Sequence, residues 1–399
     1  MTDQPAFVVG LDLSERFYVA AVQPILDAAF PGLSYAAALI GSGSEALGFD
    51  SPRSTDHNWG PRLQLFLRPD DHAAHYQAIS QTLAERLPRD ILGYSTNFTP
   101  PSASGSRQMK PLPPTLTPAA PGTPAPAALA ESASPGVAEA PVAVQDERLF
   151  VRHFVEITTI EAFFHRLLGI APTLTPRPLD WLPLPEQRLL EVTAGRVFHD
   201  GLGELTALRQ TFAYYPHDVW LYLMSAQWQR IAQEEAFVGR TGEAGDDLGS
   251  RIVTARLARD LMRLAFLLER HYAPYSKWLG TAFTRLACGP ELAPPLTEAL
   301  RAESWQGREH ALSQAYTVVA RLHNALGMTA PLPTHVSPYY GRPYVVIHAD
   351  RFAAALRAAL QDDAIRALPF QIGGVDQWVD SAEALSRPAL LARLGGVYE

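Results

Sequence analysis

The stretch of sequence that decides the predicted fold is GSGSEALGFDSPRSTDHNWGPRLQLFL, residues 41–67. It follows YAAALI, residues 35–40, an apolar run typical of a buried strand, and residues 62–67 predict a second strand. A Gly-Ser turn between a strand and the helix-like EALGF exposes backbone N–H groups, which attract an anion. The sequence therefore predicts a phosphate-binding turn made by Gly41, Ser42, Gly43 and Ser44.

Asp56 stands at the start of the second strand in this interpretation. An aspartate there can hold a divalent cation against a bound phosphate, because Mg²⁺ takes hard oxygen ligands and shares them with substrate phosphates. Taken alone, a Gly-Ser turn is weak evidence for a nucleotide site. The competing interpretation is that Asp56, His57 and Asn58 only cap a strand.

Composition narrows the class of protein. The chain has 399 residues, 47% of them hydrophobic, so it can bury a sizeable core in two or three domains. The formal net charge of -8 gives no strong nucleic-acid signal. A single cysteine, Cys288, excludes intramolecular disulfides and indicates a cytoplasmic location. An acidic N-terminus is unlike a signal peptide, and no apolar run is long enough for a membrane span, so we expect no membrane association.

Apolar periodicity predicts helices over residues 15–30 and 72–88, a strand in RHFVEITTI and a helix in EAFFHRLLG. From residue 186 onward the pattern is mainly helical. One long helix begins after Pro216 and ends near Gly239, and another runs through SRIVTARLARDLMRLAFLLERHY. Near the C-terminus we expect a strand in RPYVVIHA and a helix in DRFAAALRAALQ.

These elements predict an α+β domain with a mixed sheet, followed by a mainly helical domain. The α+β domain takes residues 1–98 and 147–180. Between its two parts, residues 99–146 are rich in Pro, Ala, Ser and Thr, and we interpret them as a disordered insertion. The helical domain takes residues 181–330, and the strand and helices of 331–399 pack on the core.

A Gly-Ser pair followed about a dozen residues later by Asp-x-Asp or Asp-x-Glu on an adjacent strand is typical of polymerase-beta-type nucleotidyltransferases. The 41–67 stretch resembles that superfamily. A closer resemblance, to the bacterial family named domain of unknown function 4037, covers nearly the whole chain except the insertion. Its blocks here are GSGSEALGFDSPRSTDHNWGPR, PEQRLLEVTAGRVFHDGLGELTALR, YYPHDVWLYLMSAQWQRIAQEEAFVGR and YAPYSKWLGTAF. The resemblance implies a nucleotidyltransferase-like sheet.

The resemblance also implies a third carboxylate from a later strand, for which Glu156 in RHFVEITTI is the match. Alternation places Phe154, Glu156 and Thr158 on one face of that strand. The implied metal ligands are therefore Asp56, Asn58 and Glu156. Asn58 departs from the pattern, because an amide brings no charge to a divalent ion. The site then works with two acids, or another acid compensates (Asp50 and Glu45 are near in sequence), or it binds nucleotide without turnover.

Helical domains of this superfamily often supply a basic side chain to the triphosphate. Lys277, in PYSKWLG, is the first candidate here and Arg263 the second. Most of the other charged residues on these helices, such as Arg259 and Asp260, read as solvated or paired with one another.

The sequence as a whole predicts a nucleotidyltransferase that moves a nucleotidyl group, AMP by default, from a Mg²⁺-bound nucleoside triphosphate to an unknown hydroxyl acceptor. Asp56 and Glu156 are the predicted catalytic residues, and Mg²⁺ is the predicted cofactor. We expect the active site between the two domains. The alternative is a nucleotide-binding protein with a weak or inactive site that regulates a protein partner.

Overall fold

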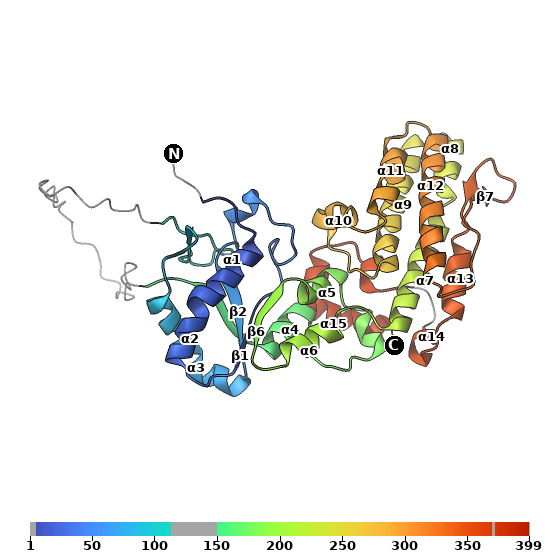
Figure 1. Ribbon diagram of the computed structural model, residues 1–399. Coiled ribbons are helices and arrows are strands. Elements are labelled where there is room, and N and C mark those ends of the chain that lie inside the picture. Colours follow the sequence, from blue (N-terminus) through green and yellow to red (C-terminus); the bar gives the residue numbers. More distant parts are fainter. Residues whose placement is uncertain (1–4, 113–149, 369–371, 399) are drawn as a thin grey trace, which may run out of the picture. The chain divides into compact units, whose positions relative to one another are not determined.

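The computed structural model describes residues 5–112, 150–368 and 372–398 (Figure 1). The chain divides into two compact units. Unit 1 is Met1–Thr159 with Gly195–Leu202, and unit 2 is Ile160–Ala194 with Gly203–Glu399. Residues 195–202, which the sequence interpretation assigned to the helical domain, lie in unit 1 because they supply a strand to its sheet.

Unit 1 is built on a four-stranded mixed sheet, which confirms the α+β class. Its strand order is β5-β2-β1-β6, with β1 antiparallel to β2 and β6, and β2 parallel to β5. The strands are β1 (Tyr35–Leu39), β2 (Arg62–Leu67), β5 (Phe154–Thr159) and β6 (Arg196–Asp200). The first three confirm the predicted strands. β6 was missed because its residues are half-buried and polar, as befits an edge.

One face of the sheet carries the core of unit 1. Leu63, Leu65 and Leu67 of β2 and Val155 and Ile157 of β5 all belong to one buried cluster. The helices that supply the rest of this cluster lie beside the sheet in Figure 1. They are α1 (Gly10–Phe17), the π-helical η1 (Tyr18–Val22), α2 (Gln23–Ala29) and α3 (Pro69–Arg86). The two predicted helices are therefore confirmed. The π-helical segment ends at Val22, two residues before Pro24, whose missing N–H interrupts the regular series of hydrogen bonds.

The first part of the predicted insertion is folded. Met109 forms a bridge with Phe98, and the N–H of Thr99 donates to the carbonyl of Gln108 at 2.8 Å. This segment follows two short strands, β3 (Asp90–Ile91) and β4 (Tyr94–Ser95). The predicted start at residue 99 is thus too early, because polar residues in 99–112 find backbone partners in unit 1. Residues 113–146 of the predicted insertion lie outside the described residues.

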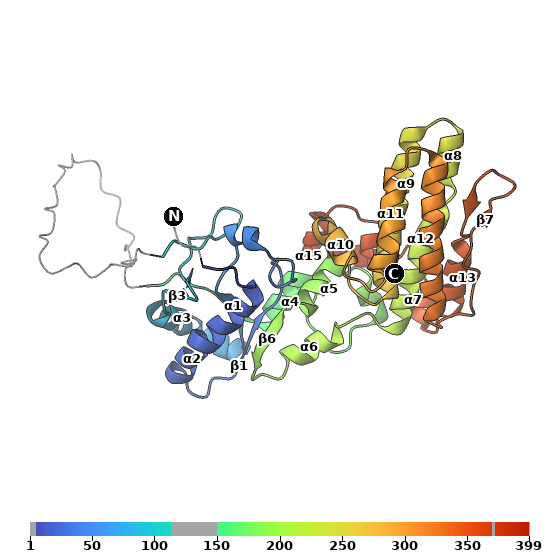
Figure 2. The same cartoon turned by 45° about the horizontal axis from the view of Figure 1, so that its top comes forward.

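Unit 2 is mainly helical. In Figures 1 and 2, α7, α9, α11 and α12 run side by side, and α13 packs on α7. The helices of unit 2 are α4 (Ile160–Leu168), α5 (Glu186–Thr193), α6 (Leu205–Thr211), α7 (His217–Glu234), α8 (Phe237–Glu243), α9 (Asp247–Leu268), α10 (Ser276–Phe283), α11 (Gly289–Arg301), α12 (Trp305–Ala325), α13 (Asp350–Ala358), α14 (Asp363–Arg366) and α15 (Pro388–Leu394). Its shorter elements are η3 (Pro178–Trp181), η4 (Val375–Gln377), η5 (Ala384–Ser386), η6 (Gly395–Val397), β7 (Ser337–Pro338) and β8 (Val345–Val346).

The ends of the long helices follow local chemistry. Asp246 caps α9 by accepting a hydrogen bond from the N–H of Gly249 at 2.8 Å. The long helix expected to reach Gly239 ends at Glu234, and α8 is a separate helix. Of the strand expected in RPYVVIHA, only β8 forms. None of the helices in the described ranges has the length and apolar content that a bilayer crossing requires.

Candidate functional site

The predicted phosphate-binding turn directly follows β1 and is a loop with free donors. Gly41 has φ +86° and Gly43 has φ +140°, values that favour glycine. The carbonyls of residues 43, 44 and 45 accept hydrogen bonds from the N–H groups of 47, 49 and 48, so the predicted EALGF helix is reduced to a turn. Within the described chain, the N–H groups from Ser42 to Ala46 donate to no protein acceptor. Such a row of amides suits an anion.

A buried ion pair supports this loop from within unit 1. The Nε atom of Arg62, at the start of β2, lies 2.6 Å from Oε1 of Glu45, and the two side chains are only 10% and 2% exposed. The Nη2 group of Arg62 also donates to the carbonyl of Ser42 at 2.9 Å. A methyl group on Gly43 would lie 2.4 Å from that same Nη2 atom. Arg62 therefore fixes the loop, and the sequence signal for it was a charged residue at the start of a mostly apolar strand.

Glu156 lies on the polar face of the sheet. It stands in register with Gln64 of β2, whose side-chain amide bonds both the N–H and the carbonyl of Ile40, each at 3.1 Å. The predicted alternation on β5 is confirmed, because Val155 and Ile157 face the core on the opposite side. The half-buried Glu156 is thus two strands away from the strand that carries the loop.

Asp56 and Asn58 do not lie on a strand, so the expectation that Asp56 stands at the start of the second strand is wrong. Asp56 ends the 3-10 helix η2 (Pro52–Asp56), and β2 begins only at Arg62. The Asp56 carboxylate is 67% exposed and lies 2.9 Å from Nδ1 of His57. Asn58 has φ +51°, and its Oδ1 atom accepts from the N–H of Arg107 at 2.8 Å. The Asn58 amide therefore holds the 99–112 segment in place through this hydrogen bond.

The two acids proposed to compensate for Asn58 have structural roles. Glu45 neutralises Arg62. Asp50 accepts hydrogen bonds from the N–H of Gly10 at 2.7 Å and from Nε1 of Trp59 at 3.1 Å. In the portion of the chain that is described, no three His, Cys, Asp or Glu side chains gather where they could hold a metal ion. The donor set does not fit a resident Mg²⁺ centre, and Asp56 stands as a single exposed carboxylate.

The two basic candidates lie in different settings in unit 2. Lys277 is exposed on α10, with Nζ 5.0 Å from the centre of the Trp278 ring. Arg263 on α9 is buried, and its Nη2 group donates to Oε1 of Glu186 at 2.8 Å and lies 3.6 Å from Oδ1 of Asp376. Burial raises the pKa of the Glu186 carboxyl to about 7, although the Arg263 charge acts against that rise.

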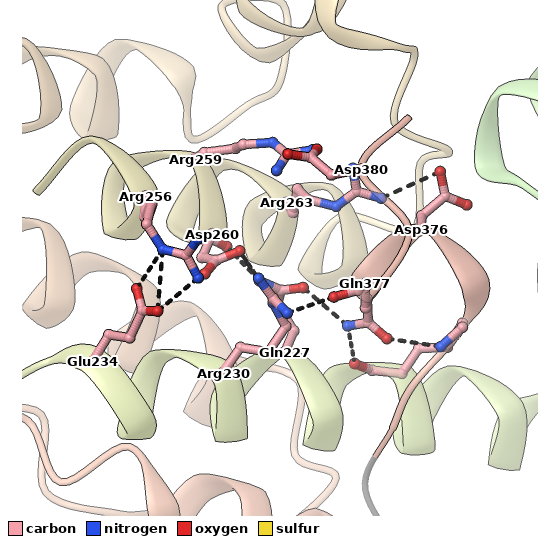
Figure 3. A network of polar contacts seen from close by, with 12 residues as sticks. Gln227, Arg230, Glu234, Arg256, Arg259, Asp260, Arg263, Asp376, Gln377 and Asp380 are labelled. Atoms are coloured by element: carbon pink, nitrogen blue, oxygen red, sulfur yellow. Dashed lines mark hydrogen bonds and ion pairs between the residues drawn. The ribbon is translucent and has the colours of Figure 1, made fainter. Parts of the chain in front are cut away.

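Arg263 also lines a cavity of about 170 Å³ in unit 2, which the sequence interpretation missed. Figure 3 shows the polar network around it, with side chains from α7, α9 and the segment that includes η4. The lining residues are Arg230, Arg256, Arg259, Asp260, Arg263, Asp376, Gln377, Trp378, Val379 and Asp380. Residues 256, 259, 260 and 263 follow the i, i+3, i+4, i+7 spacing of one helix face, which is the signal that could have found the cavity.

Residues 181–279 match the model of the family described as Domain of unknown function (DUF4037). This segment is similar to that family. The match includes α7, α9 and both basic candidates, Arg263 and Lys277, while the Gly41–Ser44 loop lies outside it. No curated protein and no solved structure matches the chain.

Proposed function

We propose that the protein is a nucleotidyltransferase that moves a nucleotidyl group, AMP by default, from a Mg²⁺-bound nucleoside triphosphate to a hydroxyl acceptor. The observation that carries this proposal is the row of free N–H groups from Ser42 to Ala46, held open by the Arg62–Glu45 pair. A glycine turn after β1, with an acidic residue on the parallel strand β5, also supports a nucleotidyltransferase-like sheet. The loop would take the triphosphate, as amide rows take phosphate in other folds.

In this proposal Mg²⁺ arrives as part of the nucleotide, with most of its ligands from phosphate and water. Asp56, exposed and near the loop in sequence, would take part in binding the nucleotide, and Glu156 would accept the proton of the acceptor hydroxyl. The acceptor oxygen forms a bond to the α-phosphorus while the bond from that phosphorus to the bridging oxygen breaks. Pyrophosphate is the leaving group, and the proton passes to a carboxylate.

A second candidate is a nucleotide-binding protein that regulates a partner without turnover. The observation that favours it is the engagement of Asn58, at the position where the superfamily has a carboxylate, with the Arg107 backbone. Both candidates need the loop, and only the enzyme releases pyrophosphate. Binding and pyrophosphate release therefore distinguish them.

The test is calorimetric titration of the full chain with ATP and Mg²⁺, together with a pyrophosphate assay over a pool of hydroxyl acceptors. Gly43→Ala should abolish ATP binding, because its methyl group would press on Arg62. The matched control is Gly48→Ala, which also has a positive φ (+72°) but meets nothing within 4 Å. Equal ATP affinity in both variants would refute the loop as the phosphate site.

Asp56→Ala tests the remaining carboxylate in the same titration. We expect it to abolish Mg²⁺-dependent ATP binding and leave the fold intact, since the side chain is exposed. Asp27→Ala, an exposed aspartate on α2, is the matched control. An unchanged ATP affinity of Asp56→Ala would remove this residue from the site.

A further inference from the structure

The cavity in unit 2 is lined by a buried arginine with one hydrogen-bond donor that no acceptor in the described chain satisfies. The Arg263 side chain is 9% exposed, and its Nε–H group has no hydrogen-bond partner in the described ranges. A buried guanidinium N–H without a partner is costly, and that cost is relieved by an anion. On the outer side, Arg259 is 40% exposed and contacts one carboxylate, that of Asp380.

The inner carboxylates of the cavity are already engaged with the protein. Asp260, with a side chain 3% exposed, accepts from Nε2 of Gln227 at 3.1 Å and from Nε of Arg230 at 3.4 Å. Oδ2 of Asp376 accepts from the N–H of Glu186 at 2.8 Å. Four arginines and three aspartates line the cavity, and Arg256 and Arg263 also pair with Glu234 and Glu186 at its edge. The donors left for a guest are the Nε–H group of Arg263 and the exposed guanidinium of Arg259. The cavity is therefore suited to a guest with negative charge.

Asp380 is the weakly held member of this set. Its side chain is 80% exposed, and Oδ1 lies 2.7 Å from Nη2 of Arg259. The two side chains lie next to each other in the upper part of Figure 3. An exposed ion pair of this kind contributes little to stability. The Asp380 carboxylate therefore occupies Arg259 in the way that a bound anion would, and it can be displaced at little cost.

We propose that this cavity is a binding site for a small oxyanion of the phosphate class, either free phosphate or the phosphoryl group of a small phosphomonoester. Arg259 and Arg263 donate to the anion, and Asp380 is an internal competitor that leaves when the anion enters. Guanidinium groups suit this role because they present parallel donors to the oxygen atoms of a phosphate. The volume of about 170 Å³ is several times the roughly 30 Å³ that a water molecule takes in the liquid, so a phosphoryl group fits.

The test is a calorimetric titration of inorganic phosphate into the full chain, in a chloride buffer without nucleotide. Arg259→Gln should weaken phosphate binding by about tenfold or more, because a charge-assisted hydrogen bond is lost. Asp380→Asn should strengthen it several-fold, because the internal competitor loses its charge. The matched controls are Arg366→Gln and Asp363→Asn, which change an exposed Arg–Asp pair on α14 in the same unit. We expect both controls to bind phosphate as the unaltered protein does.

A parallel titration with glycerol phosphate distinguishes the two sources of the anion. If the ester binds at least as tightly as inorganic phosphate, the ligand is a phosphomonoester, and if only inorganic phosphate binds, it is the free ion. Absence of binding heat for both up to about 10 mM would overturn the proposal. It is also overturned if Arg259→Gln and Arg366→Gln behave alike. Phosphate binding that Gly43→Ala removes and Arg259→Gln leaves intact would place the anion in the loop of unit 1 and overturn the cavity site.

Discussion

With Arg62 replaced by methionine, unit 1 should unfold at a much lower denaturant concentration than in the unaltered protein. The change removes the guanidinium that lies 2.6 Å from Glu45, whose side chain is 2% exposed, and it removes the donor to the Ser42 carbonyl. Breaking a buried ion pair from one side leaves an uncompensated charge and costs about 3–5 kcal/mol. This is a large fraction of a typical unfolding free energy of about 5–15 kcal/mol.

Guanidinium chloride unfolding, followed by circular dichroism and tryptophan fluorescence, measures this loss. The double variant Arg62→Met with Glu45→Gln should recover most of it, because no buried charge then lacks a partner. Arg177→Met is the matched control, because the Arg177 side chain in its ion pair with Asp180 is 80% exposed. This variant should lose less than about 1 kcal/mol of unfolding free energy. The reasoning fails if Arg62→Met loses as little as this control, or if the double variant is no more stable than the single one.

Three further predictions concern other parts of the molecule. Asn58→Ala should lower the free energy of unfolding by about 2 kcal/mol, because the acceptor for the Arg107 N–H disappears and alanine disfavours a positive φ. Asn58→Asp should keep both the stability and the Mg²⁺ dependence of nucleotide binding, and a shifted Mg²⁺ titration curve would contradict this. Burial raises the pKa of Glu235 to about 7, so the stability that this carboxyl contributes is complete below about pH 4.5 and is lost as the pH rises through 7, by up to roughly 3 kcal/mol. In urea unfolding from pH 5 to 8, the unfolding free energy of Glu235→Gln should therefore fall less steeply with pH than that of the unaltered protein, and equal slopes would count against this prediction. Gly195→Ala should lower the free energy of unfolding by more than about 2 kcal/mol, measured by thermal unfolding, because its methyl group would lie 2.0 Å from the Leu39 carbonyl oxygen. Gly203→Ala, whose methyl group would meet nothing within 4 Å, is the control, and an equal loss in both variants would argue against a clash.

Strands with mostly apolar or β-branched sequences could be predicted, including the edge strand β5, whereas the polar edge strand β6 and the short strands β3, β4 and β7 could not. YAAALI is almost entirely apolar, and RLQLFL is apolar at every position except Arg62 and Gln64, so β1 and β2 could be recognised. β6 has the sequence RVFHD, and its polar residues are tolerated because an edge strand is half-exposed. Arg196 even pairs with Asp12 and Glu15 of α1, a long-range contact that no local pattern indicates.

The candidate site was predictable only where local backbone chemistry decides it. Gly41 and Gly43 indicated a turn with exposed N–H groups, and the structure has a turn there, with positive φ at both glycines. The position of Asp56 depended on where β2 begins, and Asn58, with its positive φ, keeps the preceding residues off the strand. The arginine cavity needs Asp376 and Asp380, which are more than a hundred residues from α9 in the chain, so spacing along one helix could not reveal it.

The chain passes between the two units after Thr159, after Ala194 and again after Leu202. On the ribosome, β1, β2 and β5 therefore emerge before β6, and α4 and α5 must be synthesised before the sheet can be completed. Until then β1 has an unpaired edge, which is a template for association with other nascent chains. A truncated chain that ends before residue 196 lacks β6, keeps this edge of β1 permanently open and is expected to aggregate, even though its first 159 residues have the length of an ordinary domain.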